Sequence, residues 1–294
     1  MNTRRNSIGA DWDLIWNEVN SANISCGAYG ECASIWESKE QAESFLKSSE
    51  DDPTRLNYIL GELPLSPEFR VLDIGSGPGT VAVPVAGKVA HVTAVEPSPG
   101  MADVMEKYAA RKGVSNLDIV RKRWEDLDPF TELSGPYDLV IASYSLGMQD
   151  LGEAVRKMCA VSSGRVYIFW ISGLPDWERG MVKLWPELHG RDFCCTPQAD
   201  IIYNVLYSMG IYPDMKVRRI ESRTVFPDMN VMLSHYSRVY NVQTERQEEI
   251  LKSYLEEISD KKKDCCEISG TNMSTVFWWD VTQYGNNLYD GEYR

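Results

Sequence analysis

Short apolar stretches alternate with amphipathic stretches through the middle of this 294-residue chain. The apolar stretches predict strands at residues 71–74, 92–95, 117–120, 137–142 and 166–171, and the segments between them have the pattern of helices. Strands that alternate with helices predict a parallel sheet with helices on both faces. The expected fold is therefore α/β, a three-layer αβα sandwich around a mostly parallel sheet.

The pattern changes after residue 171. Residues 173–198 hold no strand and predict an insertion at the carboxyl edge of the sheet. Thr244 and Gln247 have the spacing of a capping box and predict the start of a helix. The rest of this half predicts helices near 199–209 and 231–240, and strands near 217–225 and 273–281.

The N-terminal segment predicts three helices rather than strands. Its apolar residues Trp12, Ile15, Trp16 and Val19 fall on one helical face, and a second helix is expected near 35–46. Asp52-Pro53 then has the composition of a helix start. We therefore expect residues 1–61 to form a helical cap or lid, and residues 62–294 to form the main domain with the insertion at about 173–198.

A proline stands inside the first predicted helix of the main domain. Pro84 lacks the N–H group that a helix interior uses. We therefore expect this helix to start late, with Pro84 in its first turn.

Composition agrees with one enzyme-sized domain. The chain is 43% hydrophobic and 25% charged, which suffices to bury a full core. No apolar run approaches the length of a membrane span, and the first residues lack the apolar stretch of a signal peptide, so a cytoplasmic location is expected. The net charge of −13 argues against a nucleic-acid substrate, because a phosphate-binding surface needs Lys and Arg.

The seven cysteines predict no disulfide framework, since the chain shows no secretory signal. Two adjacent pairs, Cys194-Cys195 and Cys265-Cys266, raise the alternative of a thiol-ligated metal or arsenite site. Structural zinc sites have two to four residues between paired cysteines, which neither pair has. No metal is therefore expected.

The most informative motif is VLDIGSGPGT at residues 71–80, with glycines at 75, 77 and 79. A chain that turns from a strand into a helix within about four residues needs backbone angles that glycine adopts most easily. The dinucleotide fingerprint G-x-G-x-x-G would place glycine where Thr80 stands, so this loop departs from it. A ligand-free tight turn remains the alternative.

An acidic residue at the end of the second predicted strand also indicates a bound ligand. Glu96 ends the second predicted strand, 19 residues after Gly77. Ligands of open α/β sheets bind at the carboxyl ends of the strands, where an acidic side chain can accept hydrogen bonds from ribose hydroxyls. We therefore expect Glu96 to hold a ribose.

The loop, Glu96 and the order of elements resemble the class I S-adenosylmethionine (SAM) dependent methyltransferases, whose sheet has seven strands with the last one antiparallel and inserted. The resemblance implies that Asp73 reaches the cofactor's ammonium group, directly or through water, and that Gly75, Ser76 and Gly77 contact the methionine moiety through their backbone. Gly79 completes the implied cofactor loop. An Asp73 that only ties down its own loop is the alternative.

The same resemblance assigns the adenosine end. Pro97 and Met101 would pack near the adenine, although Met101 fits the core of a helix equally well. Glu125 would face the adenine amino group, with the backbone N–H of Trp124 beside it. Asp126 is interpreted as a surface or capping residue.

The fourth strand leads into the stretch where the family places its acceptor. Nucleic-acid amino-methyltransferases of this class carry Asn/Asp-Pro-Pro-Tyr/Phe there, whereas this chain has Ser143-Tyr144-Ser145 and resembles the looser motif of small-molecule enzymes. Ser143 would lie beside the transferred methyl group, and Asp150 caps a helix or contacts a ligand. Trp36 resembles an aromatic lid residue that faces the sulfonium, with core packing as the alternative.

Methyl transfer from a sulfonium is an in-line displacement, so alignment of the reactants and exclusion of water can carry it. A general base is needed only for an acceptor that is protonated at the working pH. His91, His189 and His235 are candidates, but the sequence assigns no catalytic residue.

The function expected from this resemblance is SAM-dependent methylation of a small molecule, with S-adenosylhomocysteine as product. The alternatives are methylation of a protein side chain and SAM binding by a regulator without turnover. The tryptophan-bearing N-terminal segment and the closing Phe-Trp-Trp strand also make the chain similar to uncharacterised archaeal and anaerobe methyltransferases.

Overall fold

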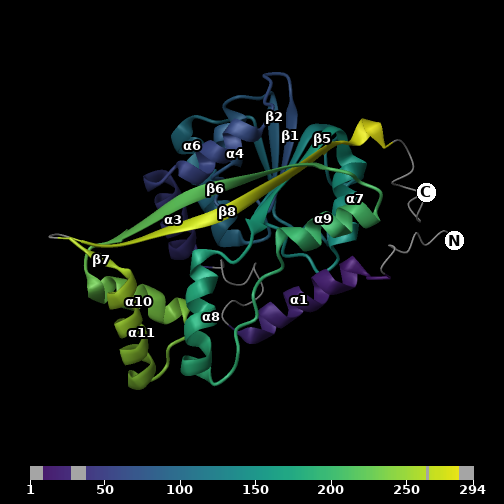
Figure 1. Ribbon diagram of the computed structural model, residues 1–294. Helices are drawn as coiled ribbons and strands as arrows, with labels where there is room; N and C mark the ends of the chain where they lie inside the picture. The colour runs from purple at the N-terminus through teal and green to yellow at the C-terminus, as the bar shows by residue number, and fades with distance from the viewer. Residues whose placement is uncertain (1–8, 28–37, 263–264, 285–294) are drawn as a thin grey trace.

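A twisted eight-stranded sheet forms the centre of the computed structural model, which describes residues 9–27, 38–262 and 265–284 (Figure 1). The strand order is β3-β2-β1-β4-β5-β8-β6, with the short β7 paired to β8. Strands β1 to β5 are parallel, and β8 runs antiparallel between β5 and β6. The predicted sandwich, with its inserted antiparallel strand, is confirmed. The strands are β1 (Arg70–Ile74), β2 (His91–Val95), β3 (Leu117–Val120), β4 (Tyr137–Ser143), β5 (Ser162–Ser172), β6 (Asp214–Phe226), β7 (Asp260–Lys261) and β8 (Cys266–Asp280).

Helices cover both faces of this sheet and bury separate cores. One core lies under α1, α7 and α9, and the other lies under α3, α4, α5 and α6. No described helix is long and apolar enough to cross a membrane. The helices are α1 (Trp12–Cys26), α3 (Lys39–Asp51), α4 (Thr54–Glu62), α5 (Ala82–Ala86), α6 (Pro99–Lys112), α7 (Leu151–Val161), α8 (Asp176–His189), α9 (Ala199–Ser208), α10 (Met229–Val239), α11 (Glu245–Ile258) and the 3₁₀ turn η1 (Val281–Gln283).

Local sequence signals explain several helix ends. The Thr244 side chain accepts a hydrogen bond from the Gln247 N–H, and the Gln247 side chain accepts one from the N–H of Thr244, so the predicted capping box is present. Helix α5 begins at Ala82, which places Pro84 in its first turn as expected. The N–H groups in the first turn of a helix have no partner within the helix. A capping box supplies such partners, and proline fits there because it has no N–H group.

The N-terminal helices lie on different parts of the main domain. In α1, the Trp16 indole is fully buried and donates to the Met148 carbonyl oxygen at 2.8 Å, and its ring lies 5.8 Å from that of Trp170. Helix α3 packs on α6, while Glu62 at the end of α4 pairs with Lys216 of β6. These contacts place α1 on one face of the sheet and α3 and α4 on the other.

Strands β6 and β8 extend well beyond the sheet. They pair continuously from Asp214 opposite Trp278 to Phe226 opposite Cys266. Their far ends pack with α8, α10 and α11 around a third core, and we call this unit the hairpin lobe (Figure 1). The insertion predicted at 173–198 is thus one part of a larger lobe. The sequence prediction began the last strand at residue 273, because residues 266–272 are mostly polar and lack the apolar run that marks the rest of β8.

Candidate functional site

A cavity of about 1260 Å³ opens at the carboxyl ends of β1, β2 and β4. Ligands of open α/β sheets bind at this edge. Its walls come from the loops after these three strands, from α3 and α4, and from the start of the hairpin lobe. The described lining includes most of the predicted cofactor residues, namely Asp73, Gly75, Ser76, Gly77, Glu96, Pro97, Met101, Trp124, Glu125 and Ser143.

The glycine loop turns on three left-handed backbone conformations. Gly75, Gly77 and Gly79 have φ values of +67°, +56° and +83°, which side-chain-bearing residues rarely adopt. A Cβ at Gly75 would collide with Ser145, whereas one at Gly77 would meet open space. The loop therefore follows the cavity wall closely after β1.

Gly79 does not belong to that wall. A Cβ at this position would lie 2.6 Å from Cγ of Met105 and 2.9 Å from Cγ2 of Val83, and Gly79 does not line the cavity. The cofactor role expected of Gly79 stays a prediction, and the contacts at this position show that the glycine also lets the loop pass close to α6.

The backbone N–H groups of the loop already have partners. Gly75 and Ser76 donate to the Val95 carbonyl oxygen at 2.8 and 3.1 Å, and Gly77 donates to Oε2 of Glu96 at 2.8 Å. These three N–H groups are therefore not free to donate to the methionine moiety. Close approach and the loop carbonyls are what this segment can offer to a ligand.

Asp73 presents an unsatisfied carboxylate at the end of β1. The residue is 2% exposed, and its Oδ2 has no hydrogen-bond partner among the residues that the structure describes. Burial raises the pKa of the Asp73 carboxyl to about 7, and the nearby charge of Glu96 adds to the rise while Ser76 opposes it. A buried orphan oxygen on a cavity wall fits a cationic group such as an ammonium.

Glu96 connects the glycine loop to the start of α6. Its Oε2 accepts from Gly77, and its Oε1 accepts from the Ser98 N–H at 2.7 Å. Burial raises the pKa of the Glu96 carboxyl, and these two hydrogen bonds counteract the effect. Each oxygen keeps a second lone pair, so this fixed carboxylate can also accept from two ligand hydroxyls.

The adenine end of the predicted site is largely apolar. Met101 is 3% exposed, belongs to the core beneath α6 and also lines the cavity. Its packing against the adenine stays a prediction. The Trp124 ring is buried and donates to the Ala154 carbonyl oxygen at 3.2 Å. Glu125 is exposed on the lining beside it.

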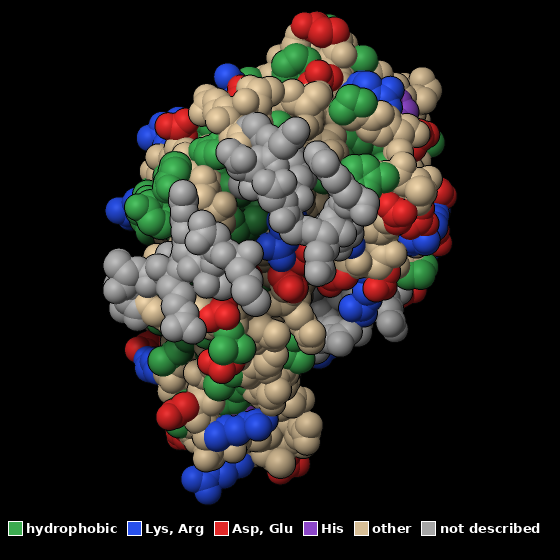
Figure 2. All heavy atoms as spheres, turned by 90° about the vertical axis from the view of Figure 1, so that its right-hand side faces the viewer, with side chains coloured by type: hydrophobic (Ala, Val, Ile, Leu, Met, Phe, Trp, Pro, Cys, Tyr) green, Lys and Arg blue, Asp and Glu red, His purple; other side chains and the backbone are tan. Residues whose placement is uncertain are grey.

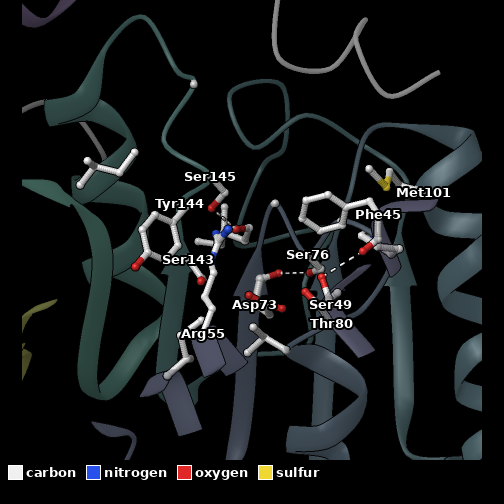
Figure 3. Close-up of a pocket in the computed structure, with 18 of the residues that line it drawn as sticks. Phe45, Ser49, Arg55, Asp73, Ser76, Thr80, Met101, Ser143, Tyr144 and Ser145 are labelled. Carbon is white, nitrogen blue, oxygen red and sulfur yellow. Dashed lines mark hydrogen bonds between the residues drawn. The ribbon is translucent and has the colours of Figure 1, made fainter. Parts of the chain in front are cut away.

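Sequence reasoning missed two residues at the opposite end, Arg55 and Tyr144 (Figure 3). Tyr144 follows β4 directly and has a φ of +54°, an unusual value for a bulky residue. Its hydroxyl hydrogen-bonds to Ser274 of β8, and the Arg55 guanidinium of α4 stacks 3.8 Å above its ring. Three elements thus hold one strained residue beside Ser143, which is a pattern typical of functional sites.

Arg55 supplies a positive charge to the cavity. Its side chain lines the wall, and within the described part of the chain it has no carboxylate within ion-pairing distance. The protein around it lowers the pKa of the guanidinium by desolvation, although arginine stays charged at neutral pH. An anionic ligand group would complement this residue.

The three histidines lie away from the cavity, whereas Asp150 lines it. His91 pairs with Asp118 at 3.0 Å, His189 bonds to the Tyr240 carbonyl oxygen at 2.9 Å, and His235 packs on Phe226. None of the three lines the cavity, and within residues 9–27, 38–262 and 265–284 no cluster of His, Cys, Asp and Glu has the geometry of a metal site. Asp150 caps α7 by accepting from the Glu153 N–H at 2.7 Å. The predicted lid residue Trp36 lies outside the described residues.

Comparison with known proteins agrees with this geometry. Residues 71–163 match the family of methyltransferase domains. An uncharacterized protein of Haemophilus influenzae is 29% identical over 201 residues, which cover 68% of this chain and 71% of that protein. The ubiquinone biosynthesis O-methyltransferase of Xylella fastidiosa is 31% identical over 124 residues, 41% of this chain and 49% of the enzyme, so the match spans about half of that relative.

Solved structures share the fold at low sequence identity. A protein of Bacillus halodurans C-125 superposes with a TM-score of 0.54 at 14% identity, covering 77% of this chain and 98% of that one. The YcgJ protein of Bacillus subtilis gives a TM-score of 0.50 at 16% identity, covering 77% and 97%. The sequence relatives reported above are bacterial, so the expected similarity to archaeal and anaerobe members is not supported.

Three observations now agree: the inserted antiparallel strand, the glycine loop with its two acidic partners, and the family match across β1 to the start of β5. Together they show a Rossmann-like methyltransferase fold with S-adenosylmethionine as its cofactor, in which residues 71–163 match the family of methyltransferase domains.

Proposed function

We propose that this chain transfers a methyl group from SAM to a small-molecule acceptor. The observation that carries the proposal is the size and continuity of the cavity. At about 1260 Å³ it exceeds the roughly 300–1,000 Å³ of a pocket for one drug-sized ligand. The same cavity therefore has room for a cofactor and for a second molecule beside it.

The residues at the glycine-loop end fit the cofactor group by group. The orphan carboxylate oxygen of Asp73 would accept a hydrogen bond from the ammonium group of the methionine moiety, and Arg55 would pair with its carboxylate. Glu96 would accept from the two ribose hydroxyls, with Pro97, Met101 and Glu125 around the adenine. The methionine moiety carries a positive ammonium group and a negative carboxylate. Asp73 and Arg55 have the complementary charges, so they favour one orientation of the bound molecule.

Ser143 and Tyr144 define the reacting end. SAM supplies a methyl group on a positively charged sulfur, and the acceptor atom must approach in line with the carbon–sulfur bond. The loop after β4 is held in one conformation by the bond from Ser145 Oγ to the Ile74 carbonyl oxygen, at 2.5 Å, and by the contact of Tyr144 with Ser274. A fixed loop here supports catalysis by alignment, which needs no histidine at the acceptor.

Charge supports a small acceptor over a nucleic acid. The chain has a net charge of −13, and Figure 2 shows acidic and basic side chains interspersed over the face it presents. A nucleic-acid enzyme needs a Lys- and Arg-rich surface for phosphates. One relative, the ubiquinone biosynthesis enzyme, is named for methylation in the synthesis of a small molecule.

Calorimetry tests the cofactor half of this proposal. S-adenosylhomocysteine titrated into native protein is expected to bind one to one, and Glu96→Ala is expected to weaken binding by roughly 10- to 100-fold, the value of hydrogen bonds to a charged group. Asp200→Ala, which removes an exposed carboxylate from α9, serves as the matched control. Unchanged affinity in Glu96→Ala would remove Glu96 from the site.

Labelled SAM tests the acceptor half. The protein is incubated with radiolabelled SAM and a cell extract, and the products are separated by size. Label in small metabolites supports the proposal, whereas label in a protein band indicates a protein side-chain methyltransferase. Cofactor binding with no labelled product indicates a SAM-binding regulator.

A further inference from the structure

The outer edge of β6 has no neighbouring strand in the sheet. Among the described strands, β6 is the last of the sheet and pairs only with β8 (Figure 1). It is 13 residues long and pairs with β8 residue by residue, without a bulge and without a proline. At about 3.3 Å per residue, this open edge is roughly 40 Å long. Such an edge offers a row of backbone N–H and C=O groups to another strand.

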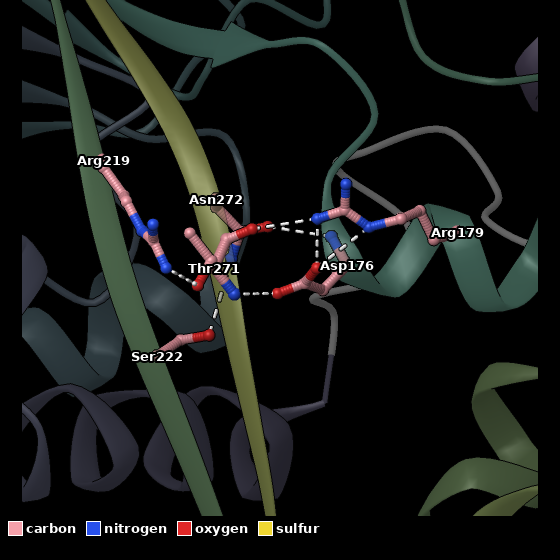
Figure 4. A network of polar contacts seen from close by, with 6 residues as sticks. All are labelled: Asp176, Arg179, Arg219, Ser222, Thr271 and Asn272. Carbon is pink, nitrogen blue, oxygen red and sulfur yellow. Dashed lines mark hydrogen bonds and ion pairs between the residues drawn. The ribbon is translucent and has the colours of Figure 1, made fainter. Parts of the chain in front are cut away.

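The other edges of the described sheet are short or covered. Strand β3, at the opposite end, has four residues. Beyond the end of β5, α8 covers the edge of β8: the Asp176 carboxylate accepts from the Thr271 N–H, and Arg179 donates to the Thr271 carbonyl oxygen at 2.9 Å (Figure 4). Further along β8, the short β7 pairs with Glu267 and Cys266. Within the described part of the chain, no second strand covers the outer edge of β6 in this way.

Two copies of β6 can pair only in certain registers. Around a two-fold axis the strands run antiparallel, so the residues on either side of the axis pair in mirror order. Outward and inward backbone groups alternate along a strand, so the axis must pass through a residue that faces its own copy. Side chains that lie directly opposite each other then share one face of the sheet.

The register centred on Ile220 makes β6 complementary to itself. Ile220 is the middle residue of the strand, so this register pairs all 13 residues. It places Arg219 directly opposite Glu221 of the second copy, twice by symmetry. Met215 and Val225, which are 53% and 49% exposed in the single chain, also lie opposite each other. The other direct pairs contain at most one charge each: Asp214 with Phe226, Lys216 with Thr224, Val217 with Arg223, and Arg218 with Ser222.

The neighbouring registers bring like charges together. An axis at Arg219 places that guanidinium opposite its own copy, and an axis at Glu221 places two carboxylates opposite each other. Like charges directly opposite each other destabilise a pair of strands. Charged residues on an edge strand usually prevent pairing. On β6 their order instead selects one register of self-pairing.

Arg219 and Glu221 are accessible for this contact in the single chain. Their side chains are 66% and 80% exposed, and the ion pair between them is long, at 3.9 Å. Arg219 also donates to Oγ1 of Thr271 at 3.3 Å, whereas the Glu221 carboxylate accepts no hydrogen bond from the described residues. A guanidinium from a second copy would supply Glu221 with a charge-assisted hydrogen bond.

We propose that two copies of this chain form a dimer by antiparallel pairing of β6 around a two-fold axis at Ile220, which joins the two sheets into one. Pairing along the whole strand adds about a dozen backbone hydrogen bonds. It also covers Met215 and Val225 at both ends of the interface. Residues 220–224 line the cavity as well, so the second copy would lie beside each cavity. This proposal goes beyond the proposed function and does not depend on it.

Sedimentation of charge variants tests the dimer. Native protein, over a series of micromolar concentrations, is expected to reach twice the mass of one chain. Arg219→Glu and Glu221→Arg should each raise the dimer dissociation constant at least about tenfold, because each places like charges opposite each other at two symmetric positions. The double variant R219E/E221R should stay within about threefold of native protein, since the exchanged charges are again complementary.

A mixture of the two single variants separates pairing from a failure to fold. Arg219→Glu carries two acidic residues at these positions and Glu221→Arg carries two basic ones. Each should be monomeric alone, and the two should form a one-to-one heterodimer when mixed. Lys88→Glu, which reverses an exposed charge in the turn before β2, is the matched control and should sediment as native protein does.

Monomeric native protein at every concentration, single variants that dimerise as tightly as native protein, or a mixture without heterodimer would each overturn the proposal. Monomeric single variants that form a heterodimer would support the register. Sedimentation depends neither on SAM nor on methyl transfer, so the dimer and the proposed function are tested separately.

Discussion

Replacing Asp73 by asparagine is expected to have opposite effects on stability and on cofactor binding. The carboxyl is almost fully buried with one oxygen unpaired, so without cofactor its negative charge destabilises the folded protein. Asparagine removes that charge at nearly the same volume. It also removes the partner of the cofactor's ammonium group, so binding of S-adenosylhomocysteine should weaken while the protein becomes more stable.

The pKa of Asp73 determines how much stability the substitution Asp73→Asn is expected to add. Burial raises it from 3.8 to about 7, a difference of about 3 pH units, which corresponds to at most ~4 kcal/mol of lost stability at high pH. A raised carboxyl pKa destabilises the fold progressively as pH rises from the unfolded value to the folded value, and the effect is constant above the folded value. Between about pH 5.5 and pH 8, the advantage of Asp73→Asn should therefore grow by about 2 kcal/mol (1.5 units at about 1.4 kcal/mol each).

Urea denaturation of native protein and Asp73→Asn at both pH values, without cofactor, measures this advantage. Asp200→Asn is the matched control, since Asp200 is an exposed carboxylate. Calorimetry on the same samples measures S-adenosylhomocysteine and 5′-methylthioadenosine, which lacks the amino-acid group. The variant should lose affinity only for the former. An advantage that does not change with pH, or equal losses for both ligands, would refute the assignment of Asp73.

Three further changes test other parts of the structure. Arg55→Gln should weaken S-adenosylhomocysteine by about 10- to 100-fold but leave 5′-methylthioadenosine unchanged in calorimetry, because the second ligand has no carboxylate; equal losses would contradict the carboxylate role. Gly79→Ala should lower the free energy of unfolding in urea by about 1–3 kcal/mol, since its Cβ would meet Met105 at a φ of +83°, and an unaffected midpoint would contradict the packing role. Thr244→Ala should cost about 0.5–2 kcal/mol by the same measurement, because it removes the capping box with Gln247, while a loss of cofactor affinity there would be unexpected.

The cofactor half of the molecule was largely predictable from the sequence. Strands such as β1 and β4 are buried on both faces and therefore appear as continuous apolar runs. The glycine loop and Glu96 stand next to such strands, so their position at the carboxyl edge followed from the strand assignments. Local signals were sufficient because each of these residues is placed by its immediate neighbours in the chain.

The group of residues around Tyr144 was not predictable in the same way. Arg55, Tyr144 and Ser274 meet from α4, β4 and β8, and no short motif connects positions so far apart. The spacing of Gly79 predicts a cofactor glycine, but it gives no sign of the close packing against Met105 of α6 that the structure shows at this position. Helices α10 and α11 of the hairpin lobe were expected from their periodicity, whereas α8 lies in the stretch that was expected only as an insertion. The core that these helices share depends on two strands that extend beyond the sheet.

A crystal structure with bound S-adenosylhomocysteine would show directly whether each part of the cofactor meets the side chain proposed for it. We predict the amino group within hydrogen-bond distance of Asp73, the carboxylate at Arg55, the ribose hydroxyls at Glu96 and the sulfur facing Ser143. A bound ligand that leaves the buried oxygen of Asp73 without a partner, or that binds outside this cavity, would contradict the account.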